Sequence, residues 1–247
     1  MPNDKSKTEI YADMLKLQAE IQFPFERHFY SHTDLWKNAT NVLDVGCGDL
    51  SYTTLLDGEF PGKSFTCIEV DPQMNAVAVS VKRPNMTILS SLDSLPTSQK
   101  FDVILLRLVL LHVSDREQFL KKVTSHLTSN GAIVLFEADD EMLYFEPEPA
   151  EFVAALNELR SKSKDRNLLP VIENEMRFLG LKLSYLDRIV VNNRFPHASE
   201  KLFQYMYRTA ELGIGRPIPD SLSRELVNWW LRKPYVQYGF FGAVFVR

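Results

Sequence analysis

The stretch Val42-Leu-Asp-Val-Gly-Cys-Gly48 constrains the fold of this chain more than any other segment. A short apolar run that stops at glycine predicts a buried strand followed by a tight turn. Glycine at positions 46 and 48 lets the backbone bend sharply and lets a ligand approach closer than any Cβ would permit. The helix predicted to follow, at about 51–57, presents free N–H groups at the same place. The turn therefore suits a nucleoside-bearing ligand, although an ordinary strand-to-helix connection has the same pattern.

An acidic side chain follows the second predicted strand, in Cys67-Ile-Glu-Val-Asp-Pro-Gln-Met74. Glu69 can accept hydrogen bonds from the two vicinal hydroxyls of a ribose, which is the role of an acid at this place in dinucleotide-binding folds. Asp71 is an alternative ribose ligand, but it also stands where it would cap the next helix. Val70 and Met74 would flank an adenine ring or pack in the core.

Strand and helix patterns alternate along the whole chain, as in α/β proteins with a mostly parallel sheet. The predicted strands cover residues 41–46, 64–69, 86–90, 101–106, 131–137, 181–191 and 240–246. The predicted helices cover residues 7–22, 25–37, 51–57, 72–81, 114–127, 149–164, 170–179, 202–212 and 222–231. The nearly all-apolar run at 101–106 is typical of a central strand that is covered on both faces.

Two local signals bound the helix after the fourth strand. Ser114 and Glu117 form a capping-box pattern, which predicts its start, and Asn130-Gly131 predicts its end. Further along, residues 196–236 are more than a plain connection between two strands needs, because loops in compact domains have about five residues. We expect this insertion to form a helical cap over a pocket, and the N-terminal helices (1–38) to form a lid.

The length of 247 residues suits one large α/β domain and is too short for two ordinary catalytic domains. Within this single domain we expect a cofactor-binding core at 39–140 and a C-terminal half at 141–247. The formal net charge is −4, with lysines and arginines scattered along the chain, which argues against a nucleic-acid partner.

No segment approaches the roughly 18 apolar residues that span a bilayer, and the N-terminus lacks an apolar targeting segment. We therefore expect a cytoplasmic protein without a membrane partner. Cys47 and Cys67 have no metal-type spacing, which favours a reducing compartment and no structural metal.

Taken together, these motifs resemble those of class I S-adenosylmethionine-dependent methyltransferases. Residues 42–48 resemble the first motif of that family, residues 68–74 its acidic second motif, and residues 101–140 its fourth and fifth strands with the helix between them. The resemblance covers residues 38–140 well. It implies a Rossmann-like, seven-stranded, mostly parallel sheet with an antiparallel last strand and helices on both faces.

The resemblance also implies site residues. The loop for the methionine end of S-adenosylmethionine contains Asp44, Gly46, Cys47 and Gly48. Glu69 matches the ribose acid, and Ser91 with Leu92 matches the segment that meets the adenine edge. The family commonly has an acidic residue where Ser91 stands, although a serine can also accept a hydrogen bond from the adenine amine. Leu50 occupies the place of a third glycine in the first motif. The product would be S-adenosylhomocysteine.

Arg107–His112 follow the fourth strand, at the carboxyl edge of the sheet, where ligands bind in open α/β folds. His112 could act as a general base on a substrate hydroxyl, or it could cap a helix or pack. Methyl transfer from a sulfonium mainly needs alignment of the nucleophile with the methyl carbon, so a base is optional. Arg107 would contact the cofactor through its backbone or pair with a nearby acid.

Two groups of residues bear on the substrate. The carboxylates of Glu137-Ala-Asp-Asp-Glu141 would be solvated or lie near a substrate amine, rather than bind a metal. Aromatic residues in the insertion suit an apolar substrate pocket, or they pack in the core. These residues are Phe203, Tyr205, Tyr207, Trp229 and Trp230.

We predict a methyltransferase acting on an oxygen, nitrogen or carbon atom of a small molecule that is partly apolar or aromatic. The family's nucleic-acid amine methyltransferases carry an Asp/Asn-Pro-Pro-Tyr element after the fourth strand, and residues 107–110 do not contain it. Three alternatives stay open. They are a protein methyltransferase, a non-catalytic regulatory module that binds S-adenosylmethionine, and an NAD-dependent oxidoreductase, because Gly46–Ser51 also fits a loose dinucleotide fingerprint.

Overall fold

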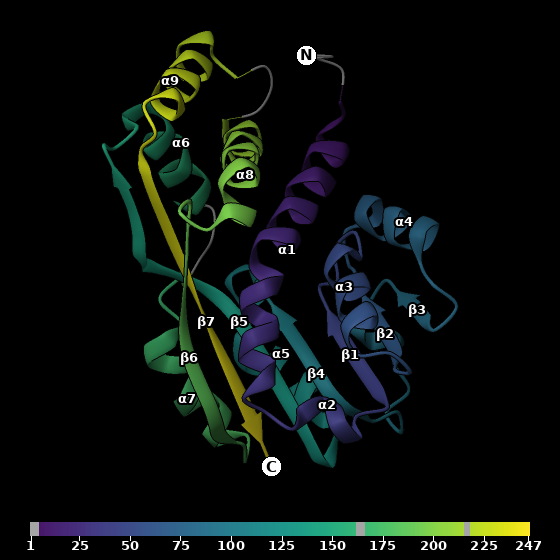
Figure 1. Ribbon diagram of the computed structural model, residues 1–247. Helices are drawn as coiled ribbons and strands as arrows, with labels where there is room; N and C mark the ends of the chain where they lie inside the picture. Colours follow the sequence, from purple (N-terminus) through teal and green to yellow (C-terminus); the bar gives the residue numbers. More distant parts are fainter. Residues whose placement is uncertain (1–4, 162–165, 215–217) are drawn as a thin grey trace.

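The computed structural model describes residues 5–161, 166–214 and 218–247 (Figure 1). Seven strands among these residues form one sheet in the order β3-β2-β1-β4-β5-β7-β6. They are β1 (Asn41–Val45), β2 (Ser64–Ile68), β3 (Met86–Leu89), β4 (Phe101–Arg107), β5 (Leu127–Glu146), β6 (Lys182–Asn192) and β7 (Tyr235–Val246). Strand β7 is antiparallel to both neighbours, and the other pairs are parallel. The predicted Rossmann-like sheet is confirmed.

Helices cover both faces of the sheet. They are α1 (Lys7–Ser31), α2 (Leu35–Asn38), α3 (Ser51–Glu59), α4 (Pro72–Val81), α5 (Arg116–Ser125), α6 (Ala150–Ser161), α7 (Leu169–Phe178), α8 (Pro196–Ile214) and α9 (Asp220–Leu231), with single turns η1 (Leu92–Ser94) and η2 (Leu110–His112). Successive strand residues face opposite sides. In β4, Val103 and Leu105 pack with α1 and α3, whereas Ile104 and Leu106 pack with α5 and α7.

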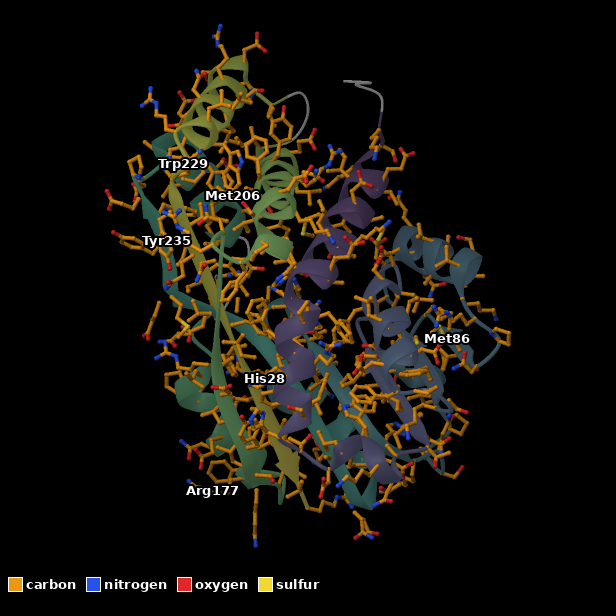
Figure 2. The ribbon with its side chains drawn as sticks, in the orientation of Figure 1. His28, Met86, Arg177, Met206, Trp229 and Tyr235 are labelled. Carbon is orange, nitrogen blue, oxygen red and sulfur yellow. The ribbon has the colours of Figure 1, made fainter. Side chains whose placement is uncertain are left out.

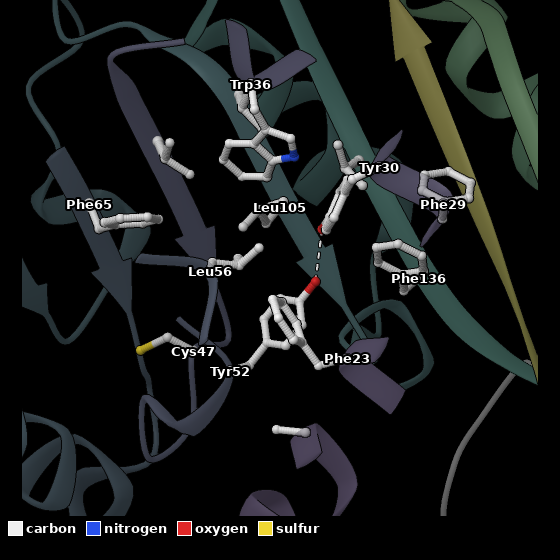
Figure 3. Packing of buried hydrophobic residues seen from close by; sticks show 14 of the residues in the cluster. Phe23, Phe29, Tyr30, Trp36, Cys47, Tyr52, Leu56, Phe65, Leu105 and Phe136 are labelled. Carbon is white, nitrogen blue, oxygen red and sulfur yellow. Dashed lines mark hydrogen bonds between the residues drawn. The ribbon is translucent and has the colours of Figure 1, made fainter. Parts of the chain in front are cut away.

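Aromatic side chains join α1 and α3 to the sheet (Figure 3). The hydroxyls of Tyr30 in α1 and Tyr52 in α3 lie 2.8 Å apart, and the ring of Phe29 packs edge-on against Phe136 of β5. Burying one such side chain contributes about 1.5–3 kcal/mol. The C-terminal half of α1 is therefore firmly anchored to the sheet.

The N-terminal segment differs from the prediction of two helices over 7–22 and 25–37. Helix α1 is one helix that continues through Pro24, although proline lacks the N–H that would bond back along the helix. Buried aromatic residues lie on both sides of this position, among them Phe23 and Phe29. Their packing against the sheet outweighs one missing hydrogen bond.

The start of α5 also differs from the predicted capping box at Ser114. The side chain of Asp115 caps this helix by accepting a hydrogen bond from the backbone N–H of Gln118 at 3.0 Å. Asp115 is therefore the N-cap residue that the sequence pattern predicted at Ser114.

Strand β5 is much longer than the predicted 131–137. It begins at Leu127, ahead of Asn130-Gly131, and runs on to Glu146. Beyond a register shift, its second half pairs with the first half of β7, where Tyr144 lies opposite Gln237. The acidic block 137–141 thus lies within a strand and not at its end, because β7 supplies hydrogen-bond partners further along.

Helices α6, α8 and α9 pack together over this extension of β5 and β7 (Figure 1). Figure 2 shows Met206 of α8 and Trp229 of α9 in this group, at the end of the molecule opposite Arg177. The helical insertion predicted at 196–236 is present as α8 and α9, and α6 joins it. Within the described part of the chain, no helix has the length and apolar character needed to cross a membrane.

Candidate functional site

The glycine turn after β1 and the acid after β2 lie side by side. Strands β1 and β2 are adjacent and parallel, so their carboxyl ends meet at one edge of the sheet. Oε2 of Glu69 accepts a hydrogen bond from the backbone N–H of Gly48 at 2.9 Å, and Oε1 accepts one from the N–H of Asp71 at 2.8 Å. Each carboxylate oxygen has a second acceptor site, so Glu69 can also accept from ligand hydroxyls.

The two glycines of the turn have left-handed backbones and close neighbours. The φ angles are +77° at Gly46 and +56° at Gly48. A Cβ on Gly46 would lie 2.5 Å from Cγ2 of Val109, and one on Gly48 would lie 2.7 Å from Cδ1 of Leu15. The turn is therefore enclosed by the segment after β4 on one side and by α1 on the other, with Leu15 directly against Gly48.

Leu50, at the place of the third glycine, adopts the conformation that glycine would favour. Its φ is +66°, and its side chain is buried. A left-handed backbone costs a non-glycine residue about 1–2 kcal/mol, an amount that burial of a leucine side chain offsets. The helix start is stabilised nearby, where Asp49 accepts hydrogen bonds from the backbone and hydroxyl of Ser51 at 3.0 and 2.7 Å.

Two more residues of the loop are buried beneath it. The carboxyl of Asp44 accepts a hydrogen bond from the hydroxyl of Thr53 at 2.5 Å, and burial raises the pKa of Asp44 to about 6. A hydrogen bond with Cys67, together with burial, raises the pKa of Cys47, which keeps its thiol protonated. Both cysteines are free. These side chains support the turn from below.

The residues predicted to meet the adenine differ in their exposure. Met74 and Leu92 are buried, whereas Val70 is 72% exposed. The hydroxyl of Ser91 accepts a hydrogen bond from the N–H of Asp93 at 3.0 Å and starts η1. Met74 and Leu92 are therefore the apolar side chains buried at this place, and their contact with an adenine stays a prediction.

Asp71, the alternative ribose ligand, is a helix cap. Its Oδ1 accepts hydrogen bonds from the backbone N–H groups of Gln73 and Met74 at 3.0 and 2.8 Å. Of the two acids after β2, Glu69 is the one that touches the glycine turn.

Arg107 pairs with a nearby acid, which is one of the two roles predicted for it. Its Nε lies 2.9 Å from Oε1 of Glu26 in α1, and its guanidinium lies 4.3 Å from the ring centre of Tyr52. A second nitrogen donates to Gln22. The side chain therefore ties β4 to α1 and lies over an aromatic ring of α3.

A buried acid that sequence analysis treated only as part of the acidic block orders the segment after β4. Oε1 of Glu137 accepts hydrogen bonds from the backbone N–H groups of Val109 and Leu110 at 2.9 and 2.7 Å. Burial raises the pKa of Glu137 to about 8, more than these bonds lower it. The apolar strand that ends in an acid was the available signal for this residue.

His112 ends this segment, in η2, with its side chain exposed. Partial desolvation and the positive charge of Arg166 lower the pKa of His112, so its imidazole is neutral at pH 7. A neutral imidazole can take up a proton.

A pocket that contains about 720 Å³ of empty space, open solvent included, lies between α1, α6, α8 and the extension of β5 and β7. Leu108 lines it, and the next residue, Val109, contacts Gly46. One two-residue segment therefore separates the pocket from the glycine turn. The remaining lining residues are Gln18, Gln22, Ala138, Asp139, Asp140, Leu143, Phe145, Phe152, Leu156, Arg160, Arg166, Leu202, Tyr205, Met206, Thr209, Val236, Tyr238, Gly239 and Phe240.

The predicted aromatic residues divide between pocket and cap core. Tyr205 lines the pocket and accepts a hydrogen bond from Gln18 at 3.2 Å. The other four pack within the cap, namely Phe203, Tyr207, Trp229 and Trp230. Among the residues that the structure describes, no group of three or more histidine, cysteine, aspartate or glutamate side chains is arranged to hold a metal ion.

Comparison with known protein families matches residues 43–133 to a methyltransferase domain. The matched segment begins within β1 and ends within β5, and it contains both glycines of the turn and Glu69. A comparison with curated protein sequences gave no significant match.

Solved structures share the fold at low sequence identity. A candidate sarcosine dimethylglycine methyltransferase from Galdieria sulphuraria has a TM-score of 0.60 at 16% identity, covering 90% of this chain and 84% of that one. The YcgJ protein from Bacillus subtilis has a TM-score of 0.54 at 16% identity, covering 84% of this chain and 92% of that one. A Haemonchus contortus phosphoethanolamine N-methyltransferase, solved with phosphomonomethylethanolamine and S-adenosylhomocysteine, has a TM-score of 0.53 at 16% identity, covering 83% of this chain and 48% of that one. The family match and these folds confirm the predicted resemblance to class I methyltransferases.

Proposed function

We propose that this chain, a class I methyltransferase by its fold and by the domain at residues 43–133, moves the methyl group of S-adenosylmethionine to a small-molecule acceptor. The acceptor atom is an oxygen, nitrogen or carbon nucleophile, and S-adenosylhomocysteine is the second product. The observation that carries this proposal is the direct hydrogen bond between Glu69 and Gly48, which brings the two predicted ends of the cofactor site together.

The residues at this edge fit the proposed cofactor. The bare backbone of Gly46 and Gly48 leaves room at the methionine end, above Asp44 and Cys47, and Glu69 has free acceptor capacity for the ribose. The adenine would lie near four residues, namely Val70, Met74, Ser91 and Leu92. When bound, the cofactor supplies an electrophilic methyl group on a sulfonium.

For a ligand to lie on the turn, the N-terminal part of helix α1 would have to move away from it. Leu15 packs against Gly48, and Thr8 hydrogen-bonds Gln73 at the start of α4. We propose that the N-terminal part of α1 is a lid and that α8 and α9 form the cap of the substrate pocket. Arg107, which holds α1 through Glu26, would then couple the lid to the strand that borders both sites.

The pocket suits a small molecule. Most of its lining is apolar with a few polar groups, as in ligand sites, and helices on several sides would keep a folded macromolecule out. The chain's main task is then to align the acceptor with the methyl group, which is the requirement of an in-line displacement. His112 is neutral at pH 7 and is the side chain that we propose as a base where the acceptor must lose a proton.

The proposal includes the partners and the compartment. A net charge of −4 and the scattered basic residues favour neither nucleic acid nor an anionic membrane as a partner. Two free cysteines are in keeping with the cytoplasm.

A transfer assay tests the proposal. The protein is incubated with S-adenosylmethionine labelled in its methyl group and with a cell extract that has been separated into molecules below and above about 3 kDa. We expect label in the small-molecule fraction, and less of it with the variant Glu69→Ala. Label confined to protein or nucleic acid would contradict a small-molecule substrate.

A further inference from the structure

We propose that the pocket selects acceptors that carry a carboxylate, and that Arg160 and Arg166 bind this group. The inference rests on the proposed function, because it names the substrate class of the same pocket. Both arginines line the cavity, Arg160 from the end of α6 and Arg166 from the segment before α7.

The two arginines share one acid. Oδ1 of Asp140 lies 2.8 Å from Nη2 of Arg160 and 3.0 Å from Nη2 of Arg166, and Oδ2 lies 2.6 Å from Nε of Arg166. Burial alone would raise the pKa of Asp140, but the hydrogen bond from Arg166 and the charges of both arginines lower it. Asp140 is therefore ionised at neutral pH and balances one of two positive charges.

The second acid of the pocket wall does not supply the missing charge. Oδ2 of Asp139 lies 2.7 Å from Nε of Arg188, a residue of β6 that does not line the pocket. Arg188 also pairs with the exposed Glu141 at 3.1 Å. Three acids of the block predicted to lie solvated or near a substrate amine, Asp139, Asp140 and Glu141, are thus already paired with arginines. Among the residues that the structure describes, one guanidinium charge at the pocket is therefore in excess.

Partial burial of the two arginines strengthens the attraction of this excess charge for an anion. The side chains of Arg160 and Arg166 are 21% and 24% exposed, so water screens them less than it screens a surface residue. The buried Nε of Arg160 has no hydrogen-bond partner among the described residues. Guanidinium groups also match a carboxylate in geometry, because they offer parallel N–H donors.

The rest of the wall indicates the body of the ligand. The wall also contains neutral polar groups, among them Gln18, Tyr205 and Thr209, and many apolar side chains. The apolar lining includes Phe145, Phe152, Leu202, Met206 and Phe240. A molecule with a carboxylate at one end and an apolar or aromatic body satisfies both parts.

Three probes with the same phenylpropyl body, of which the carboxylate and the amide also share their shape, test the charge preference. We would titrate the full chain with 3-phenylpropanoate, 3-phenylpropanamide and 3-phenylpropylammonium, each with and without saturating S-adenosylhomocysteine. A charge-assisted hydrogen bond exceeds a neutral one by enough to predict that the carboxylate binds about tenfold tighter than the amide. The ammonium should bind more weakly still.

Variants of the assigned residues should change the preference for carboxylate in opposite directions. Arg160→Gln and Arg166→Gln should each reduce the preference for carboxylate over amide severalfold. Asp140→Asn keeps an acceptor for the arginines but removes the balancing charge, so it should increase the preference. Arg177→Gln is the control, because this arginine lies on α7, outside the pocket, and should leave the preference unchanged (Figure 2).

The outcomes separate this inference from the proposed function. A carboxylate preference with or without S-adenosylhomocysteine that falls in the arginine variants supports the inference. Equal binding of carboxylate and amide under both conditions overturns it, as does a preference that all variants retain. The heat of S-adenosylhomocysteine binding, measured in the same titrations, reports separately on the proposed function.

Discussion

The carboxylate of Glu69 and the backbone N–H of Gly48 form a hydrogen bond of 2.9 Å across 21 positions of sequence. Glu69 follows β2 and Gly48 follows β1, so the bond joins the ends of two adjacent strands at the place where the turn would bind the cofactor. The loop and the acid are therefore a single unit, and a change at either should affect the other.

Replacing Glu69 with alanine should weaken the binding of S-adenosylhomocysteine at least tenfold, because it removes the ribose acceptors and releases the amide of Gly48. Asp71→Ala is a matched comparison two positions away. It should cost about 1 kcal/mol of stability through loss of the α4 cap and leave ligand affinity within about twofold. Titration calorimetry and urea unfolding of both variants check this, and equal affinity losses would contradict the separate roles of the two acids.

A methyl group at Gly46 should destabilise the fold more than one at Gly62. Both glycines have φ near +80°, so alanine costs about 1–2 kcal/mol of backbone strain at either site. At Gly46 the new Cβ would also lie 2.5 Å from Val109, whereas nothing lies within 4 Å at Gly62. We expect Gly46→Ala to lose at least about 1 kcal/mol more in urea unfolding. Equal losses would mean that Val109 moves aside freely.

Breaking the pair between Glu26 and Arg107 should be costly. The side chains are 0% and 9% exposed, and Glu26→Ala would leave a buried guanidinium without its counter-charge. The expected loss is about 3–5 kcal/mol in the free energy of unfolding. Asp34→Ala, which removes the exposed partner of Lys37, should cost less than about 1 kcal/mol. Denaturant titrations measure both losses. Similar losses for the two variants would contradict the prediction that the buried pair stabilises the fold more than the exposed pair does.

Glu137 should make stability depend on pH. Because burial raises the pKa of Glu137 to about 8, the folded protein keeps a proton there that the unfolded chain releases above about pH 4.3. The stability from this carboxyl is complete below the unfolded pKa and is lost as the pH rises toward 8. The variant Glu137→Gln keeps an acceptor for the N–H groups of Val109 and Leu110 and cannot ionise.

The free energy of unfolding of Glu137→Gln, relative to that of the unchanged protein, should therefore increase between about pH 5 and 8. The slope should reach at most about 1.4 kcal/mol per pH unit and vanish above pH 8. Urea unfolding at several pH values measures this difference. A difference that stays constant with pH would show that Glu137 is ionised in the folded protein throughout this range.

The sequence predicted the first four strands and their helices closely, because each strand is a short apolar run bounded by turn residues. It failed where long-range pairing decides the structure. Nothing within 127–146 shows that β7 extends β5 to Glu146, and nothing near Pro24 shows that the sheet holds both halves of α1. These outcomes depend on partners elsewhere in the sequence, which range from Tyr52, 22 positions from Tyr30, to the distant strand β7.

The residues of the candidate site also divide into those that the sequence predicted and those that it did not. The glycine turn and Glu69 could be found because two local motifs sit at the ends of adjacent strands. The pairing of Arg107 with Glu26, and the pocket residues Arg160 and Arg166, could not, because an isolated charge carries no periodic or motif signal. Only the fold shows which acids they meet.

Calorimetric titration of the purified chain with S-adenosylhomocysteine, set beside NADH, tests the central claim most directly. We predict saturable one-to-one binding of S-adenosylhomocysteine and no heat from NADH. No binding of S-adenosylhomocysteine at millimolar concentration, or saturable binding of NADH in its place, would contradict the assignment of the turn at Gly46–Gly48 and of Glu69 to this cofactor.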